Sequence, residues 1–308
     1  MNNMKENNGF ENIQQEIEEL LEFLEHTMEH ISTLQDFMNG EMQTVKAVKH
    51  TLPARPSVII FSSDIHFGSF YTNYAELTEL YKLLMDADSN VYVVLNGDVI
   101  DNFDVFAGML AVKVLNSQVI PPVYQRAFLT RLLKALSYNK KLLGFVIGNH
   151  EEFSQWEFLK GANTPIGLNR LTIKLHFENA FDLTIACVHK SRFNSFLNPI
   201  HSSLRELMLL YPYADIVVTS HTHTPAIMSF PYPSEEGYKN RWLIKTGSLK
   251  DLDPYTYKYF SPYPQSGIST PAVLVLPYSR QVIGFNDYRI ALNVLSLIEE
   301  KLKEVKDA

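Results

Sequence analysis

A chain of 308 residues is long enough for one large domain, or for one domain with an appended segment. Its hydrophobic content of 46% is ordinary for a protein with a full core, and no apolar run reaches the ~18 residues that span a bilayer. Cys187 is the single cysteine, which excludes an internal disulfide and fits a reducing compartment. We therefore expect a cytoplasmic protein that does not enter a membrane.

The net charge of −7 belongs to the N-terminal segment. Residues 1–50 carry ten acidic and three basic side chains, whereas the remaining residues carry 24 of each sign. The main body of the chain is therefore neutral and offers no broad basic field to attract nucleic acid. This weakens a prediction of duplex binding without excluding a local groove.

The first fifty residues carry a heptad pattern. One series spaced by seven is apolar throughout, and a second, offset by three, fails only at Thr27 and Glu41; the two series are Ile17, Leu24, Ile31, Met38, Val45 and Ile13, Leu20, Thr27, Leu34, Glu41, Val48. The pattern predicts an acidic helix over residues 1–50 that forms a coiled coil, joining copies of the chain through residues 13–48. A single amphipathic helix lying on the rest of the chain is the alternative. Two prolines then end the helix, so residues 51–56 are predicted to form a linker.

From residue 57 onward, short apolar runs alternate with segments of helical spacing. Strands are predicted at 58–61, 91–95, 141–147, 171–177, 183–188, 215–219, 243–245, 272–276 and 282–285. Helices are predicted at 74–86, 125–137, 199–210 and 291–305. Alternating strands and helices early, with hairpins late, indicate an α/β (α+β) domain over residues 57–308, in which mixed sheets pack together with helices outside.

Five polar clusters follow directly after short apolar runs, so each is expected where a buried strand ends. They are Asp64-Ile65-His66, Gly97-Asp98 with Asp101, Gly148-Asn149-His150-Glu151, His189, and His221-Thr222-His223. Imidazoles, carboxylates and one amide oxygen gathered at strand ends can hold two divalent cations. Two cations about 3.5–4 Å apart clamp a phosphoryl group and activate a water. The pattern favours a two-metal phosphoester hydrolase.

Each cluster also has an ordinary structural interpretation when it stands alone. A D-x-H triplet is common by chance, Asp98 can cap a helix, and a Gly-Asn pair often makes a turn. A single histidine at a strand end is more often solvated than bound to a metal. The order and chemistry of all five clusters together favour metal binding.

The ordered set D-x-H, G-D-x-x-D, G-N-H-E, H and H-x-H resembles the calcineurin-like metallophosphoesterase superfamily, over roughly residues 57–286. The resemblance implies a four-layer α-β-β-α sandwich, here preceded by the long N-terminal helix. It implies one metal held by Asp64, His66, Asp98 and His223, and a second held by Asp98, Asn149, His189 and His221. It also implies that His150 is the general acid or transition-state donor, oriented by Asp101. Manganese is the expected metal, with iron or zinc as alternatives.

Two positions depart from the family pattern. Ser220 stands where a glycine usually precedes H-x-H, and Asn102 stands where the phosphoprotein phosphatases have an arginine. An arginine at this position would bind a dianionic phosphomonoester through two hydrogen bonds. Its absence favours diesters as substrates. Lys190 and Arg192 follow a predicted ligand and are candidates, with Asn102, for substrate binding. The alternative is that both cations are simply solvated.

Two segments are candidates for shaping specificity: 103–122, which is apolar and would form a wall beside the metals, and 252–264, whose aromatic rings can stack on bases near a phosphate site. A core helix and an ordinary surface loop are the alternatives. The leading hypothesis is a phosphodiesterase acting on nucleotides or single-stranded nucleic acid, similar to the nuclease branch of the superfamily. Alternatives are a phosphomonoesterase or pyrophosphate hydrolase acting on a small molecule, and a non-catalytic scaffold that keeps the fold.

Overall fold

The computed structural model describes residues 47–86, 90–102, 117–153, 159, 164–195, 197–234, 237–251 and 269–307. The predicted N-terminal helix and its coiled coil lie outside these residues, except at their last positions. The aromatic segment 252–264 and most of 103–122 also lie outside them.

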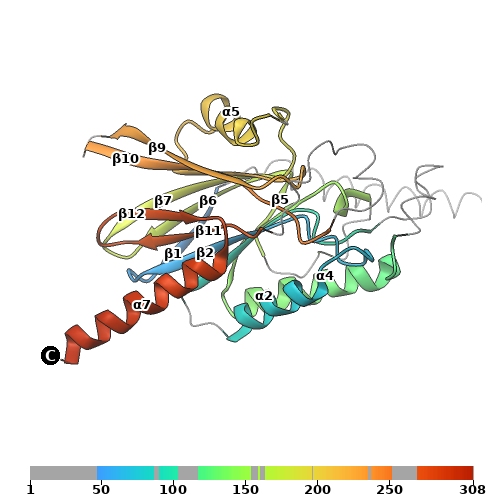
Figure 1. Cartoon of the computed structure of the whole chain (residues 1–308), viewed down its shortest axis with the longest axis horizontal. Helices are drawn as coiled ribbons and strands as arrows, with labels where there is room; N and C mark the ends of the chain where they lie inside the picture. The colour runs from blue at the N-terminus through green and yellow to red at the C-terminus, as the bar shows by residue number, and fades with distance from the viewer. Residues whose placement is uncertain are drawn as a thin grey trace, which may run out of the picture. The chain divides into compact units, whose positions relative to one another are not determined.

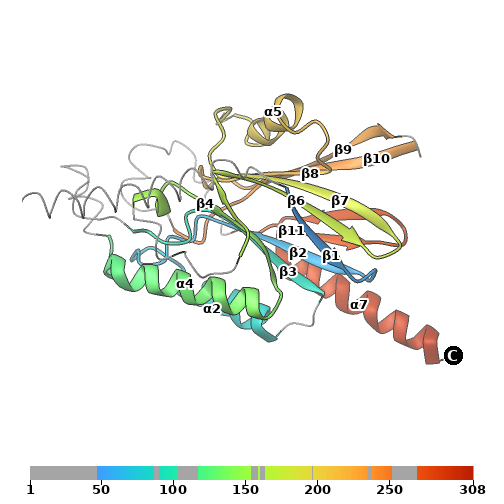
Figure 2. The same cartoon turned by 180° about the vertical axis from the view of Figure 1, so that it is seen from behind.

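Two six-stranded sheets form the centre of the molecule (Figures 1 and 2). Sheet A has the order β1 (Val48–Leu52), β6 (Arg170–Phe177), β7 (Phe181–Val188), β8 (Ile216–Thr219), β10 (Gly237–Lys245) and β9 (Ala226–Ser234). Sheet B has the order β12 (Gln281–Phe285), β11 (Ala272–Leu276), β2 (Ser57–Ser62), β3 (Val91–Asn96), β4 (Leu142–Ile147) and β5 (Ile166–Leu168).

Helices cover the outer face of each sheet, as Figure 1 shows. The helices α2 (Tyr74–Asp86), α4 (Pro122–Tyr138) and α7 (Tyr288–Asp307) pack on sheet B, and α5 (His201–Leu209) packs on sheet A. A short 3₁₀ helix, η1 (Glu151–Phe153), follows β4. The order helix, sheet, sheet, helix confirms the predicted four-layer α-β-β-α sandwich.

Among the described residues, three hydrophobic clusters fill the spaces between the four layers. Strand β2 shows why, since all six of its residues are buried. Val58 and Ile60 pack in the cluster beneath the helices of sheet B, whereas Ile59 and Phe61 pack between the two sheets. A strand covered on both faces is apolar on both faces, which explains the unbroken apolar runs in the sequence. Cys187 lies in the cluster between the sheets as a buried thiol.

The predicted strands and helices after residue 57 are confirmed within three residues, and α2 has the predicted bounds, but β10 begins at Gly237 instead of the predicted residue 243. Three strands were not predicted: β1, β5 and β9. The first of these corrects the sequence interpretation, because residues 48–50 were assigned to the helix and 51–52 to the linker. Instead, Val48–Leu52 pairs in parallel with β6 from Ile173 to Phe177.

The parallel pairs place the polar clusters together. Strands β2, β3 and β4 are parallel in sheet B, and β7, β8 and β10 are parallel in sheet A. Their carboxyl ends therefore meet at one edge of each sheet, which is where ligands bind in sheets of this kind. No helix in the described ranges is both long and apolar enough to cross a membrane.

Candidate metal centre

The structure gathers all seven predicted metal ligands, and His150, at the carboxyl ends of these strands. Three groups of possible ligands lie close enough to share an ion within the described residues: Asp64, His66 and His223; His66, Asp98 and His150; Asp98, His189 and His221. The first and third groups belong to the two separate metal sets that the family resemblance implies. That these side chains bind metal remains a prediction.

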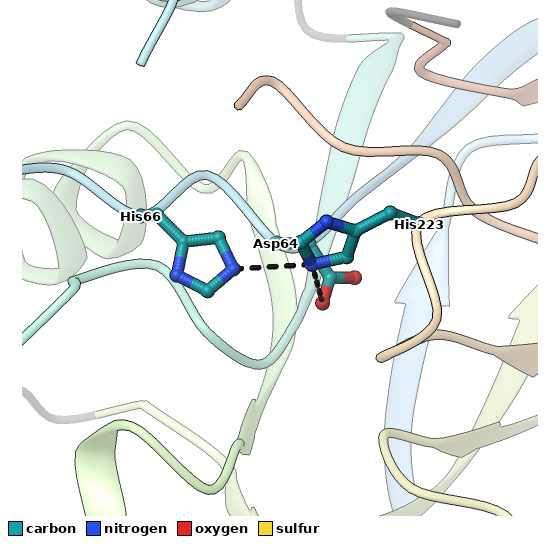
Figure 3. Close-up of side chains that lie close together, drawn as sticks. All are labelled: Asp64, His66 and His223. Atoms are coloured by element: carbon teal, nitrogen blue, oxygen red, sulfur yellow. Dashed lines mark hydrogen bonds and ion pairs between the residues drawn. The ribbon is translucent and has the colours of Figure 1, made fainter. Parts of the chain in front are cut away.

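The first group joins the end of β2 to the loop after β8 (Figure 3). His66 Nε2 lies 3.2 Å from His223 Nε2, and His223 Nε2 lies 3.4 Å from Asp64 Oδ1. Both imidazoles thus present a ring nitrogen to the same small space as the carboxylate. One cation placed there would have three protein ligands of the kinds that zinc, manganese and iron accept.

The third group centres on Asp98, which follows β3. Asp98 Oδ2 lies 3.1 Å from His189 Nε2 and 4.0 Å from His221 Nδ1. Asn149 adds its amide oxygen, 3.3 Å from His189 Nε2. Asp98 Oδ2 also lies 4.0 Å from His150 Nε2. This carboxylate therefore belongs to two of the three groups and would be available to both proposed cations.

Five of the proposed ligands have a left-handed backbone, which L-residues with a side chain rarely adopt. They are Asp64, His66, Asp98, His221 and His223, with φ from 49° to 77°. Such conformations cost about 1–3 kcal/mol each and cluster at functional sites. In this chain they turn consecutive side chains sharply at the strand ends, so that ligands separated by one residue face the same space.

Two glycines allow the strand ends to approach closely. A Cβ on Gly97, whose φ is +87°, would lie 2.3 Å from His189 Nδ1, and a Cβ on Gly148 would lie 2.2 Å from Asp98 Oδ1. Both distances are far inside van der Waals contact. The glycines of the G-D and G-N-H-E motifs are therefore required because ligand side chains pack directly against their backbone.

Hydrogen bonds fix which nitrogen each buried imidazole presents. His66 Nδ1 donates to Asp101 Oδ1 at 3.1 Å, and His189 Nδ1 donates to the carbonyl of Asn96 at 2.7 Å. The Nε2 atoms are thereby turned toward the proposed cations, and a cation bound at His189 would take the place of a proton on its Nε2. A ligand histidine commonly has such a partner on its other nitrogen, which fixes the tautomer and the ring orientation.

The contacts of Asp101 show how it orients His150. The main-chain carbonyl of Asp101 accepts the bond from His150 Nδ1 at 2.6 Å, while its carboxylate binds His66 and lies 3.7 Å from Lys250 Nζ. His150 is oriented by residue 101, but the carboxylate acts on the proposed ligand.

The electrostatics of the centre favour positive charge. Burial opposes ionisation of Asp64, but its close contact and charge interaction with His223 outweigh burial and lower its pKa to about 2. Burial would lower the pKa of His189, but the charge of Asp98 raises it to about 10. Burial, assisted by the charge of His150, lowers the pKa of His66 to about 4 and keeps it neutral.

A buried oxygen without a donor tests whether the centre suits a metal. Asp64 Oδ1 is fully buried and has no hydrogen-bond partner, although its pKa shows that the carboxylate is ionised. An uncompensated buried carboxylate oxygen is costly unless a cation binds it. The mixed carboxylate, imidazole and amide donors also suit divalent metals. The residues present therefore fit the expected pair of divalent ions.

Glu151 was part of the G-N-H-E motif but had no predicted role. Its carboxylate is fully buried and accepts four main-chain N–H bonds, from Gly148, Asp98, Val99 and Ile100, at 2.7–3.1 Å. These bonds join the loop after β4 to the loop after β3. Glu151 therefore holds Asp98 and Gly148 in place through their main-chain N–H groups and is not itself a proposed ligand.

The structure separates the three candidate substrate residues. Asn102 is fully buried; its amide donates to the carbonyl of His150 at 2.9 Å and accepts from Arg126 Nη1 at 3.2 Å. Lys190 and Arg192 are exposed in the loop that follows His189. Asn102 thus supports the His150 loop, whereas the two cations stay candidates for substrate contact.

Comparisons with known proteins give one assignment. The family model described as calcineurin-like phosphoesterase matches residues 57–225, more than half of the chain. A search of curated proteins finds no match.

Solved structures give similarities of low identity. A metallophosphoesterase from Sphaerobacter thermophilus is 15% identical, with coverage of 75% of this chain and 88% of that one and a TM-score of 0.35. Vps29 from Entamoeba histolytica, complexed with zinc, is 14% identical, with coverage of 74% and 97% and a TM-score of 0.33. The calcineurin-like phosphoesterase YfkN from Bacillus subtilis is 12% identical, with coverage of 82% and 100% and a TM-score of 0.37.

The assignment rests on the family model, since TM-scores of this size carry no argument. The matched range contains every polar cluster of the centre, from Asp64 to His223. The chain therefore belongs to the calcineurin-like phosphoesterase family and is a metal-dependent phosphoester hydrolase.

Proposed function

We propose that the centre holds two divalent cations, most simply manganese, and hydrolyses phosphodiesters of nucleotides or single-stranded nucleic acid. One cation would be held by Asp64, His66, Asp98 and His223, and the other by Asp98, Asn149, His189 and His221. When bound, such a pair supplies Lewis acidity and hydroxide at neutral pH. The observation that carries the proposal is the convergence of these side chains around Asp98.

His150 is proposed to serve the leaving group. Its Nδ1–H is fixed on the carbonyl of Asp101 and its main-chain N–H on Asp98 Oδ1 at 2.9 Å, so Nε2 faces the centre. A protonated Nε2 in this position can deliver its proton to the departing alkoxide. General acid catalysis of this kind contributes about 10²–10⁴-fold in rate.

The preference for diesters rests on Asn102. A guanidinium at this position would give a bidentate grip on a phosphomonoester dianion, which an amide lacks. The Asn102 amide is moreover occupied by His150 and Arg126 in the protein interior. Lys190 and Arg192, exposed beside the centre, are proposed to contact the remaining part of a longer nucleotide substrate.

Arg126 favours a second candidate, a phosphomonoesterase. This residue of α4 brings a guanidinium to 3.2 Å from Asn102 Oδ1, beside the position where the sequence lacks an arginine. If Arg126 reaches the substrate, it replaces part of the missing charge. A pyrophosphate hydrolase would use the Arg126 guanidinium in the same way. The two candidates predict opposite substrate preferences.

Hydrolysis of bis-p-nitrophenyl phosphate and of p-nitrophenyl phosphate, both with added Mn²⁺, separates the candidates. A phosphodiesterase cleaves the first faster, and Arg126→Gln leaves this preference in place. A monoesterase cleaves the second faster, and Arg126→Gln removes that activity. Asp98→Ala gives the background rate. If wild type hydrolyses neither compound faster than this variant, the proposal is contradicted.

We also propose that the heptad segment joins two copies of the chain through residues 13–47, since Val48 belongs to β1. Sedimentation of the full chain is compared with that of a chain beginning at Val45, which retains β1. The full chain should sediment as a dimer and the shortened chain as a monomer. Equal states of association would refute pairing through this segment.

A further inference from the structure

A chain of buried polar side chains lies beneath the metal centre and joins the two sheets. Ser63 follows β2 and Asn96 ends β3 in sheet B, while Ser220 follows β8 and Thr246 follows β10 in sheet A. All four side chains are at most 3% exposed. Buried hydroxyls and amides are stable only when their hydrogen bonds are made, so their contacts define a specific arrangement.

The contacts run in one line from Asn96 to a proposed ligand. Asn96 Nδ2 donates to Ser220 Oγ at 2.5 Å, and the hydroxyls of Ser220 and Thr246 lie 2.9 Å apart. Thr246 Oγ1 lies 2.5 Å from Ser63 Oγ, which donates to Asp64 Oδ2 at 2.5 Å. Ser220 Oγ accepts from both Asn96 Nδ2 and Thr246 Oγ1, while Ser63 gives its single hydroxyl hydrogen to the carboxylate.

This line decides which oxygen of Asp64 faces the cations. Oδ2 is bound by Ser63 and also accepts from the main-chain N–H of His221 at 3.2 Å. Oδ1 is left buried without a donor, 3.4 Å from His223 Nε2. The carboxylate is thus held with one oxygen saturated and the other open, before any ion arrives.

The same residues contact other proposed ligands. The carbonyl of Asn96 accepts the bond from His189 Nδ1, and Ser220 immediately precedes His221. This line of side chains therefore contacts proposed metal ligands at both of its ends. It also gives a role to Ser220, where the family pattern has a glycine without a hydroxyl.

We propose that Ser63, Thr246 and Ser220 are positioning residues which orient Asp64 and thereby set the affinity of the centre for divalent cations. The inference rests on the proposed function, because it requires the cations to bind at Asp64. Removing a polar group that hydrogen-bonds to a metal ligand commonly weakens metal binding by about 10–100-fold.

The test is the dissociation constant for Mn²⁺, measured by calorimetry on the full chain without substrate. Ser63→Ala, Ser220→Ala and Thr246→Val are each expected to weaken binding by about 10–100-fold. Thr246→Ser keeps the hydroxyl and should restore binding to the wild-type level. Ser202→Ala is the matched control, because Ser202 is equally buried and bonds to Thr219 Oγ1 at 2.9 Å, outside this line.

The possible results separate the inference from the proposed function. If wild type binds Mn²⁺, Asp98→Asn does not, and the three hydroxyl variants bind like wild type, the positioning role is wrong. If Ser202→Ala weakens binding as much as they do, general destabilisation is the cause and the role is also wrong. Absence of Mn²⁺ binding by wild type would instead contradict the metal centre itself. Should one hydroxyl variant not fold, the other two decide.

Discussion

Individual residues of the centre are held by bonds that the ligand set alone does not reveal. Glu151 is the clearest case, since its carboxylate is buried and satisfies four main-chain donors from two loops. Asp101 and Lys250 form a second support behind His66. These supports help Asp98 and His66 to keep a left-handed backbone that is unfavourable in isolation.

Glu151→Ala should strongly destabilise the fold. The substitution leaves four buried N–H groups without an acceptor, and each such group costs about 1–3 kcal/mol. The free energy of unfolding in urea is expected to fall by at least about 3 kcal/mol. Glu152→Ala, at an exposed neighbouring position, is the control and should change it by less than about 0.5 kcal/mol. Similar small losses in both variants would show that Glu151 is not a structural support.

Asp101→Asn distinguishes the two roles of this side chain. Its carboxylate accepts from His66 Nδ1, and an amide can instead donate to that nitrogen, which moves the imidazole hydrogen to Nε2. A ligand nitrogen that carries a hydrogen cannot bind a cation, so Mn²⁺ affinity should fall by about 10–100-fold. Calorimetry without substrate measures this directly. Unchanged affinity with reduced turnover would show that Asp101 acts through His150 alone.

The sequence predicted which residues gather but not how they are supported. Asp64, His66 and the other predicted ligands each follow an apolar run, and strand-end position is visible in a linear pattern. The pairing of Asp101 with His66, and of Ser220 with Thr246, depends on the register and approach of separate strands. Nothing in the spacing of these residues specifies those distances. Ser220 offered one signal, because it departs from the family pattern.

At the level of elements, strands buried on both faces were the easiest to predict. Strand β9 was missed because Pro231 and Pro233 interrupt its pattern; proline is tolerated there because β9 lies at the edge of sheet A. Strand β5 has only three residues. Strand β1 was missed because Val48 also fits the heptad series, and local pattern cannot decide between a helix and an edge strand.

His50 attaches β1 to the opposite sheet and should make stability depend on pH. Its Nε2 donates to the carbonyl of Leu143, in β4, at 2.7 Å. Burial lowers its pKa below the ordinary 6.5, against the opposing effect of this bond. The unfolded chain therefore takes up the proton more readily, so the stability contribution is complete above pH 6.5 and is lost as the pH falls below that value.

His50→Gln keeps a donor for Leu143 but does not titrate. Relative to this variant, wild type should lose stability between pH 7.5 and pH 5, while other titrating groups cancel in the comparison. Urea unfolding at several pH values gives the difference. A constant difference across this range would mean that His50 is not buried as a neutral group, and that β1 does not dock as described.

At the scale of the whole molecule, the centre combines ligands from both sheets, which polar side chains join beneath it. Asp64, His66, Asp98 and Asn149 follow strands of sheet B, whereas the remaining ligands, His189, His221 and His223, follow strands of sheet A. An ion bound by both sets links both sheets. Binding should therefore stabilise the complete fold instead of one loop, because the ligands are together only in the folded chain.

Added Mn²⁺ is accordingly expected to raise the unfolding temperature. At a free concentration about 100 times the dissociation constant, binding contributes about 2.7 kcal/mol, which corresponds to about 5–10 °C for a domain of this size. A chelator should reverse the increase, and Asp98→Asn should abolish it, because Asp98 lies between both groups of ligands. Scanning calorimetry tests this with a single transition expected in each state. If Mn²⁺ raised the temperature of Asp98→Asn as much as that of wild type, the ion would be binding elsewhere and would not link the sheets.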